Sequence, residues 1–118
     1  MPKAVFYHNP RCSKSRQALQ YLQAQNVEMN VVDYLKEGLK IDEVKTLYDA
    51  LNTDDASLMI RPKEAEYKLA QLNKQSPTQD ILQALVDYPK LLERPILLMG
   101  SKAAIGRPLE NIQAIVND

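Results

Sequence analysis

The chain of 118 residues contains a single cysteine, Cys12. A lone cysteine cannot close an internal disulfide, and structural disulfides are rare in reducing compartments. Any redox work at Cys12 therefore needs a partner sulfur from another molecule. A zinc site is disfavoured on similar grounds, because one histidine and one cysteine provide too few of the usual ligands. We expect no bound metal and no bound cofactor.

The chain also lacks an excess of either charge, since 15 basic residues balance 15 acidic ones. A neutral molecule has no general attraction for nucleic acid or for an anionic membrane, so any preference for anions must be local. The longest dense apolar stretch, Ile96–Met99, is too short to cross a bilayer. Met1–Lys3 leads into a strand-like run without the core of a signal peptide. We expect a cytoplasmic protein with neither nucleic acid nor a membrane as partner.

The composition is that of an ordinary globular protein, with 45% hydrophobic and 25% charged residues. The length suits one domain with its own core. Because no repeat, low-complexity segment or linker interrupts the chain, we expect a single domain over residues 1–118. The absence of a heptad pattern makes a monomer the default expectation.

The first third of the chain predicts a βαβ unit. The β-prone run Ala4–Tyr7 ends at the turn-forming cluster His8–Pro10. From Ser13 onward the apolar residues recur with helical spacing until Asn26, and Val27–Tyr34 reads as a second strand. A strand, a helix and a strand in this order predict a parallel pair with the first helix beginning close to Cys12.

A block of helices is expected next, at about residues 40–92. Its last helix has a start signal in which Ser76 is the N-cap and Pro77 the first residue. The expected helices cover residues 41–51, a short segment ending near Ile60, residues 63–72 and residues 77–88.

After this block, Pro95–Met99 and Lys102–Ile105 predict a hairpin around Gly100–Ser101, and Gly106–Pro108 opens a last helix. The order βαβ, helices, ββα predicts an α/β fold with a mixed sheet. This is the organisation of a thioredoxin-like domain that carries a helical insertion.

The position of Cys12 favours a reactive thiolate. Unpaired backbone N–H groups and the dipole at a helix N-terminus stabilise an anionic sulfur. Arg11, Lys14 and Arg16 add positive charge nearby. The alternative is a buried cysteine that acts as a small hydrophobic residue; the strand, turn, helix and cations around it favour the reactive interpretation.

Two neighbours are candidates for a part in this chemistry. Ser15 completes a C-x-x-S arrangement, in which a hydroxyl could donate a hydrogen bond to the thiolate but cannot resolve a disulfide. His8, the only histidine, lies four residues before Cys12 and could orient the loop or tune the thiol. A structural role for His8 is favoured over proton transfer.

The segment Tyr7–Arg16, with the sequence YHNPRCSKSR, closely resembles the active-site signature of the arsenate reductases linked to glutathione and glutaredoxin, the thioredoxin-fold branch of that enzyme class. Arg61 with Tyr67, the stretch Glu93–Ile96 and the stretch Ile105–Pro108 match the same family in order and spacing. The chain differs from the best-characterised members in carrying Lys14 where they have threonine.

The resemblance implies a mechanism and a set of site residues. Cys12 attacks arsenate to give a thiol–arsenate adduct, and Arg61, Arg94 and Arg107 hold the oxyanion. Glutathione, as co-substrate, reduces the adduct and leaves a mixed disulfide that glutaredoxin opens. The planar guanidinium group suits such an oxyanion, and several of them offset its repulsion by a thiolate. The resemblance also implies a cis peptide bond at Arg94–Pro95.

Two other functions fit the same sequence. One is a glutathione-dependent thiol reductase, in which the arginines bind a glutathione carboxylate. The other is a redox-responsive regulator of the same fold that binds RNA polymerase. Such regulators sense through an internal C-x-x-C pair, which Ser15 removes in this chain.

Overall fold

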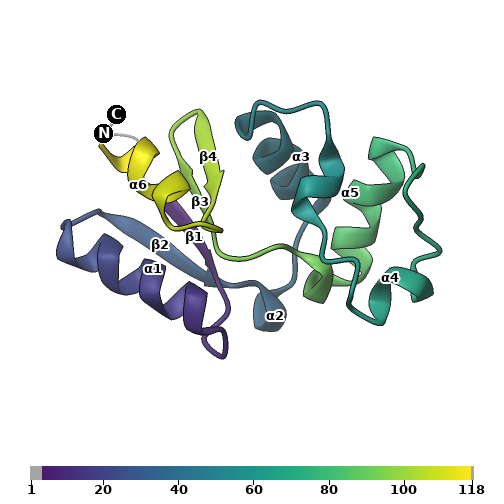
Figure 1. The fold of residues 1–118 in the computed structure, drawn as a ribbon, viewed down its shortest axis with the longest axis horizontal. Helices are drawn as coiled ribbons and strands as arrows, with labels where there is room; N and C mark the ends of the chain where they lie inside the picture. The colour runs from purple at the N-terminus through teal and green to yellow at the C-terminus, as the bar shows by residue number, and fades with distance from the viewer. Residues whose placement is uncertain (1–3, 118) are drawn as a thin grey trace. The chain divides into compact units, whose positions relative to one another are not determined.

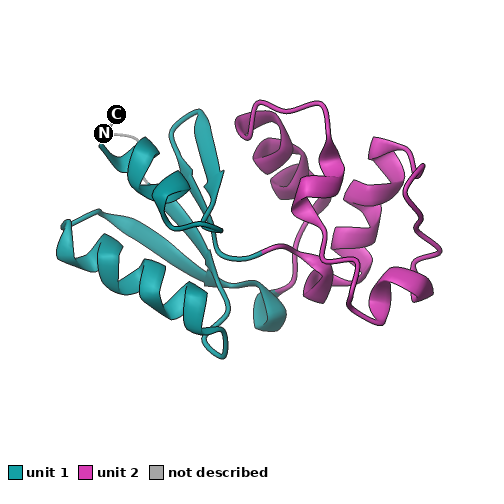
Figure 2. Cartoon of the chain, viewed as in Figure 1, with its two compact units in different colours: residues 1–37, 94–118 teal, residues 38–93 magenta. Residues whose placement is uncertain are grey.

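The short β-prone run at the start of the chain forms a strand, as predicted. The computed structural model describes residues 4–117, so the Met1–Lys3 stretch, which we expect to carry no signal peptide, lies outside the described residues. The chain divides into two compact units (Figure 2): unit 1 comprises Met1–Glu37 with Arg94–Asp118, and unit 2 comprises Gly38–Glu93. Unit 2 corresponds to the helical block predicted at residues 40–92. The single domain over residues 1–118 stays a prediction.

Unit 1 is a mixed sheet with helices (Figure 1). Its elements are β1 (Ala4–His8), α1 (Ser13–Ala24), β2 (Met29–Asp33), α2 (Tyr34–Glu37), β3 (Ile96–Met99), β4 (Lys102–Ile105) and α6 (Glu110–Val116). The strand order is β2-β1-β3-β4, with β1 parallel to β2 and antiparallel to β3, and β3 antiparallel to β4. This arrangement confirms the predicted α/β fold with a thioredoxin-like mixed sheet.

Both α1 and α6 pack against one face of this sheet. Phe6 of β1 pairs in register with Leu97 of β3, and both side chains are fully buried. Leu22 of α1 and Ile112 of α6 belong to the same hydrophobic cluster. The apolar positions of each helix, spaced by three or four residues, therefore lie over the strands β1 and β3.

The strand directions decide which loops meet. Because β1 and β4 both run antiparallel to β3, the carboxyl ends of β1 and β4 lie at the same edge of the sheet as the start of β3. Tyr7 near the end of β1, Ile96 at the start of β3 and Ile105 at the end of β4 are joined in register. The loops that follow β1 and β4, and the segment that precedes β3, leave from this edge.

Unit 2 is helical. Its elements are α3 (Ile41–Ala50), the 3₁₀ helix η1 (Ala56–Met59), α4 (Glu66–Leu69), α5 (Thr78–Asp87) and the 3₁₀ helix η2 (Pro89–Leu91). Val44, Leu47, Met59 and Leu85 are among its fully buried side chains. None of the helices in residues 4–117 is long and apolar enough to cross a membrane.

Two details of unit 2 differ from the sequence-based predictions. The helix expected at residues 63–72 is only the single turn Glu66–Leu69, which buries no side chain and leaves Leu69 62% exposed. Ser76 is not the N-cap of α5, because its Oγ accepts a hydrogen bond from the N–H of Asn73 at 2.8 Å and Pro77 takes the cap position. At Ser76 a local turn competes successfully with the helix cap.

Candidate active site

The candidate site lies where the edge of the unit 1 sheet meets the start of α1. Cys12 is the N-cap of α1, with an extended backbone, and its N–H donates a hydrogen bond to the carbonyl of Asn9 at 3.0 Å. The side chain of Cys12 is 9% exposed. The prediction that the first helix begins beside Cys12 is confirmed.

The surroundings of Cys12 favour the thiolate. Burial raises the pKa of the thiol, but the backbone N–H of Ser15, the guanidinium of Arg94 and the backbone N–H of Lys14 together outweigh this effect. The pKa of Cys12 is therefore held below its ordinary value. Two of these donors are the free N–H groups of the first turn of α1, as expected for a helix N-terminus.

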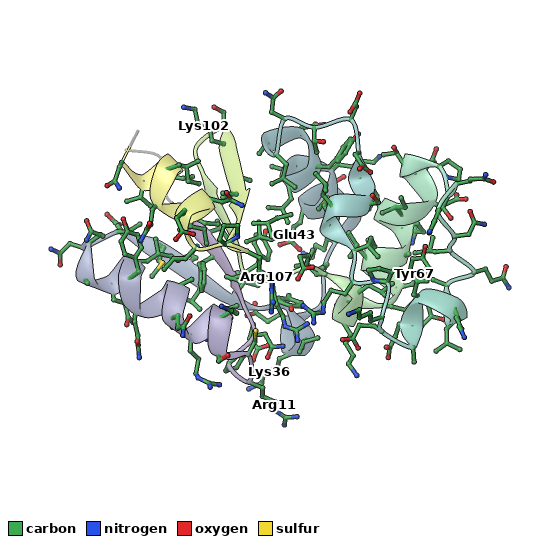
Figure 3. All side chains as sticks on the ribbon, viewed as in Figure 1. Arg11, Lys36, Glu43, Tyr67, Lys102 and Arg107 are labelled. Atoms are coloured by element: carbon green, nitrogen blue, oxygen red, sulfur yellow. The ribbon has the colours of Figure 1, made fainter. Side chains whose placement is uncertain are left out.

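A second guanidinium also reaches the sulfur. Arg107, labelled in Figure 3, follows β4, and its Nη2 donates a hydrogen bond to the Sγ of Cys12 at 3.3 Å. Its Nε donates another to the carbonyl oxygen of Arg94 at 2.7 Å. This second bond fixes the plane of the Arg107 guanidinium against the segment that carries Arg94. Two of the three arginines predicted for the oxyanion therefore lie at the sulfur.

Gly106 explains how Arg107 comes so close. The N–H of Gly106 donates to the carbonyl of Pro95 at 2.7 Å. A Cβ on Gly106 would lie 2.6 Å from Cδ1 of Ile112 and 2.9 Å from Cγ of Pro95. Only glycine fits this contact without displacing its neighbours. The Arg94–Pro95 peptide bond is cis, as the resemblance implied, and so is the bond between Arg107 and Pro108.

His8 and Ser15 form a buried pair beneath the loop that carries the cysteine. Nδ1 of His8 lies 2.7 Å from Oγ of Ser15, which also accepts a hydrogen bond from the N–H of Asn9 at 3.0 Å. No hydrogen bond joins either the His8 ring or the Ser15 hydroxyl to the sulfur within residues 4–117. The Ser15 hydroxyl thus holds the loop, and Ser15 reaches the thiolate through its backbone N–H instead.

The environment of His8 favours the neutral form of the imidazole. Burial is the main cause that lowers the pKa of His8 from its ordinary value. The charge of Arg16 lowers this pKa further, and the charge of Asp33 raises it. The ring also stacks on Phe6, with centroids 5.5 Å apart. A neutral, buried ring that bonds to Ser15 fits the orienting role favoured from the sequence.

Arg61, the third arginine predicted for the oxyanion, belongs to unit 2. Its Nη1 forms an ion pair with Oε1 of Glu93 at 2.8 Å, and its Nε lies 3.5 Å from Oε1 of Glu64. Its role in binding an oxyanion stays a prediction.

Two residues of the site have roles that the sequence did not predict. Asn9 accepts hydrogen bonds from Cys12 through its carbonyl and from the N–H of Arg11 through Oδ1 at 3.0 Å. An asparagine before a proline is a turn signal that could have identified this role. Gly106 was predicted as part of a helix start and of the family-like stretch Ile105–Pro108, but nothing in its local pattern indicates the contact with Ile112.

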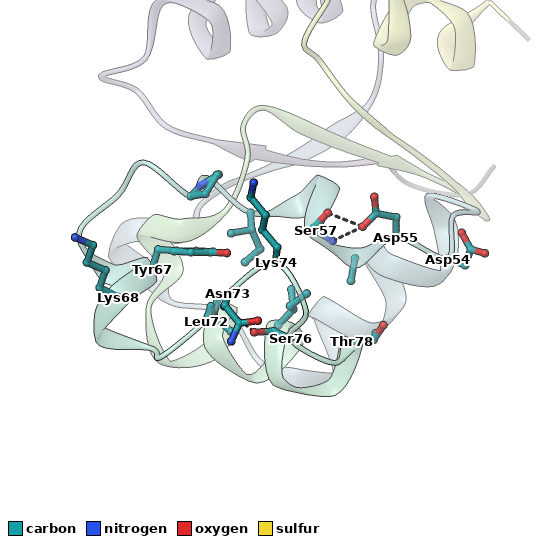
Figure 4. A pocket seen from close by; sticks show the side chains of 14 residues that line it. Asp54, Asp55, Ser57, Tyr67, Lys68, Leu72, Asn73, Lys74, Ser76 and Thr78 are labelled. Carbon is teal, nitrogen blue, oxygen red and sulfur yellow. Dashed lines mark hydrogen bonds between the residues drawn. The ribbon is translucent and has the colours of Figure 1, made fainter.

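A cavity of unit 2, about 660 Å³, is lined by residues between Asp54 and Ile81 (Figure 4). Tyr67, Lys74 and Ser57 are among its lining residues. The N–H of Ser57 donates a hydrogen bond to Oδ1 of Asp55 at 3.1 Å. The lining contains no cysteine and no arginine, so it supplies neither the nucleophile nor the guanidinium groups of the candidate site. Within residues 4–117 no group of His, Cys, Asp and Glu side chains is placed to hold a metal ion.

Comparison with known proteins is consistent with this geometry. The sequence model of the ArsC family matches residues 7–115. An arsenate reductase from Neisseria meningitidis is 44% identical over 117 residues, which cover 98% of this chain and all of that protein. One from Haemophilus influenzae is 34% identical over 113 residues, covering 95% and 97% of the two chains.

A solved structure described as an arsenate reductase from Vibrio cholerae superposes with a TM-score of 0.88 at 37% identity, covering 97% of this chain and 98% of that one. The family match extends over both units, from the last residues of β1 to α6. It therefore includes Cys12 and all three arginines predicted for the oxyanion. The chain belongs to the ArsC family.

Proposed function

We propose that this protein is an arsenate reductase in which Cys12 is the nucleophile and glutathione and glutaredoxin supply the reducing sulfur. The contact that carries the proposal is the pair of guanidinium groups, from Arg94 and Arg107, at the Sγ of Cys12. A structural cysteine needs neither a lowered pKa nor two arginines. The names of the family members described above support arsenate as the substrate.

In the first step the Cys12 thiolate attacks the arsenic of arsenate, an S–As bond forms, and one oxygen leaves as water after protonation. The two reactants are both negative, so their approach is opposed by repulsion that Arg94 and Arg107 offset. The free N–H groups at the start of α1 add donors on the same side. Arg61, which the family resemblance adds to this set, would contribute a third guanidinium.

In the second step glutathione delivers the second sulfur. Its thiolate forms an S–S bond with Cys12, the S–As bond breaks, and the electron pair stays on arsenic, which is reduced from As(V) to As(III) and leaves as arsenite. Two thiols are oxidised to one disulfide in the process. Glutaredoxin then takes the glutathionyl group through its own thiolate and restores the Cys12 thiolate.

The test is a coupled assay of NADPH consumption with arsenate, glutathione, glutaredoxin and glutathione reductase. We expect arsenate-dependent turnover for the wild type and none for Cys12→Ser. Arg107→Lys keeps the charge but loses the planar fork, and it should lower kcat/KM for arsenate by roughly tenfold. Arg11→Gln is the matched control, because Arg11 is an exposed arginine of the same loop (Figure 3) that no hydrogen bond joins to the sulfur within residues 4–117.

A parallel assay with thioredoxin and thioredoxin reductase in place of the glutathione system tests the identity of the reductant. If thioredoxin alone supports turnover, the protein is still an arsenate reductase, but its dependence on glutaredoxin is overturned. If the wild type shows no turnover with arsenate but reduces a glutathionylated substrate, the protein is instead a glutathione-dependent thiol reductase. Binding to RNA polymerase without turnover would establish the regulator.

A further inference from the structure

A groove beside Arg107 is lined by several side chains that the chemistry described so far does not use. It lies in unit 1, has a volume of about 420 Å³, and is bounded by the first turns of α1 and by the segment that joins β4 to α6. Its lining residues are Lys14, Gln17, Gly106, Arg107, Pro108, Leu109 and Glu110. Arg107 both lines the groove and donates to the Sγ of Cys12, so one lining side chain connects the groove to the reacting atom.

The charges of the groove are of both signs and are separated along it. Lys14 and Arg107 bring two positive groups, and Glu110 brings one negative group. Neither Lys14 nor Glu110 takes part in an ion pair with another residue of the described range 4–117. A long ammonium and a carboxylate that are not neutralised by each other can both interact with a ligand.

We propose that this groove binds glutathione, with Lys14 facing a carboxylate of the tripeptide and Glu110 facing its α-ammonium group. At neutral pH glutathione carries two carboxylates and one ammonium group, which is the inverse of the two cations and one carboxylate of the groove. The volume lies within the range of about 300–1,000 Å³ that is typical of small-molecule sites. The assignment rests on the proposed function for its place in turnover, because it identifies where the second thiol arrives.

Gln17 extends the polar wall one turn further along α1. Residues 14 and 17 are three apart and lie on the same side of the helix. The amide of Gln17 can donate to a peptide carbonyl and accept from a peptide N–H of a ligand that runs along the helix. The groove therefore offers one side chain for each end of the tripeptide and one for its backbone.

The site can be tested without arsenate through a reaction of the wild-type thiolate with glutathione disulfide. The Cys12 thiolate attacks one sulfur of the disulfide, a mixed disulfide forms, and one glutathione thiolate leaves. The neutral reagent hydroxyethyl disulfide undergoes the same exchange but has no charged groups. The ratio of the two second-order rate constants, measured by mass spectrometry of the intact protein, isolates recognition of the peptide from reactivity of the sulfur.

We expect this ratio to fall about two- to fivefold in Lys14→Gln and in Glu110→Gln, the range of a solvent-exposed ion pair. The ratio should also fall with added salt in the wild type but less in the variants. Arg11→Gln removes a cation from the same loop outside the groove, and it should leave the ratio unchanged. An unchanged ratio in both groove variants, or an equal fall in Arg11→Gln, would overturn the assignment.

The outcome is independent of the assay for arsenate. If arsenate is not reduced while the groove variants lose selectivity for glutathione disulfide, the glutathione site is supported and the arsenate reductase function is overturned. If arsenate is reduced with glutathione while selectivity is the same in every variant, the proposed function stands and the groove is not the glutathione site.

Discussion

The Nη2 of Arg107 lies 3.3 Å from the Sγ of Cys12, although 95 positions separate the two residues in the sequence. The topology of the sheet accounts for this contact. The carboxyl ends of β1 and β4 share one edge, so the loop after β1 presents Cys12 where the segment after β4 presents Arg107. The start of β3, preceded by Arg94, lies at the same edge. A positive pocket is thus assembled in a chain whose net charge is zero.

Replacing Arg94 with glutamine should raise the pKa of Cys12. Arg94 lowers this pKa through both a hydrogen bond and its charge, and glutamine retains at most the hydrogen bond. The ultraviolet absorbance of the thiolate, followed against pH, measures the pKa directly. Alkylation by iodoacetamide at neutral pH should slow in parallel. Arg11→Gln serves as the control, and an unchanged titration in Arg94→Gln would remove Arg94 from the account of the thiolate.

The stability of the protein should depend on the charge of Cys12. Because the pKa of the folded-state thiol lies below its ordinary value, the folded state gains stability relative to the unfolded state as the pH rises between these two values. The gain is complete above the unfolded pKa and is lost as the pH falls through the folded pKa. The difference in free energy of unfolding between wild type and Cys12→Ser should follow this course, with a slope of at most about 1.4 kcal/mol per pH unit. A difference that is flat with pH would contradict a lowered pKa.

Ser15→Ala should lower the stability of the protein but leave the lowered pKa of Cys12 largely in place. The substitution leaves Nδ1 of His8 and the N–H of Asn9 without their hydrogen-bond partner, and each buried group costs about 1–3 kcal/mol when unsatisfied. The backbone N–H of Ser15 remains, so the pKa of Cys12 should stay below its ordinary value. Denaturant unfolding and thiolate titration measure the two effects separately. Ser13→Ala, at an exposed position of the same turn, is the matched control.

Gly106→Ala should lower both stability and activity, because its Cβ would collide with Ile112 and Pro95. Overpacking of this kind costs typically about 1–3 kcal/mol. Displacement of the segment would also move Arg107 away from Cys12. The second substitution Ile112→Val removes Cδ1, the atom nearest to the added Cβ. The double variant should therefore recover part of the loss in thermal stability and in kcat/KM. A double variant that is no better than Gly106→Ala would contradict the steric explanation.

Arg61 and Glu93 form an ion pair whose two ends can be tested separately. Arg61→Gln and Glu93→Gln both break the pair and should lower the stability of the protein. Only Arg61→Gln removes a guanidinium, so only it should raise KM for arsenate, by roughly tenfold if a charge-assisted hydrogen bond is lost. An equal rise of KM in both variants would show that Arg61 acts through the fold of unit 2 and not as a ligand of the oxyanion.

Local patterns were sufficient to predict the strands, most of the helices and the position of Cys12. The β1–α1–β2 unit follows from short-range periodicity, and the N-terminus of α1 is marked by the turn that precedes it. The helix predicted at residues 63–72 shortens to the single turn α4, which buries no side chain and leaves Leu69 exposed, so packing stabilises little of it. Ser76 was assigned to the wrong motif because a serine serves a local turn as well as a helix cap.

The details of the site depend on contacts between distant segments. That Arg107 reaches Cys12, and that the Ser15 hydroxyl binds His8 and not the sulfur, follow from the packing of three loops at one sheet edge. No local rule encodes these pairings. Only the family resemblance identified Arg94 and Arg107 in advance, and it did so without stating which atom of each would meet the thiolate.

The hydroxyl at position 15 has a kinetic consequence. After oxidation the sulfur of Cys12 has no companion in the same chain, so its lifetime is set by diffusional encounter with molecules in solution. In the proposed sequence of steps the adduct on Cys12 waits for a thiol from solution, because the product leaves only when that thiol attacks. If the proposed mechanism holds, the throughput of the enzyme would report the supply of small thiols around it as much as the abundance of the compound it consumes.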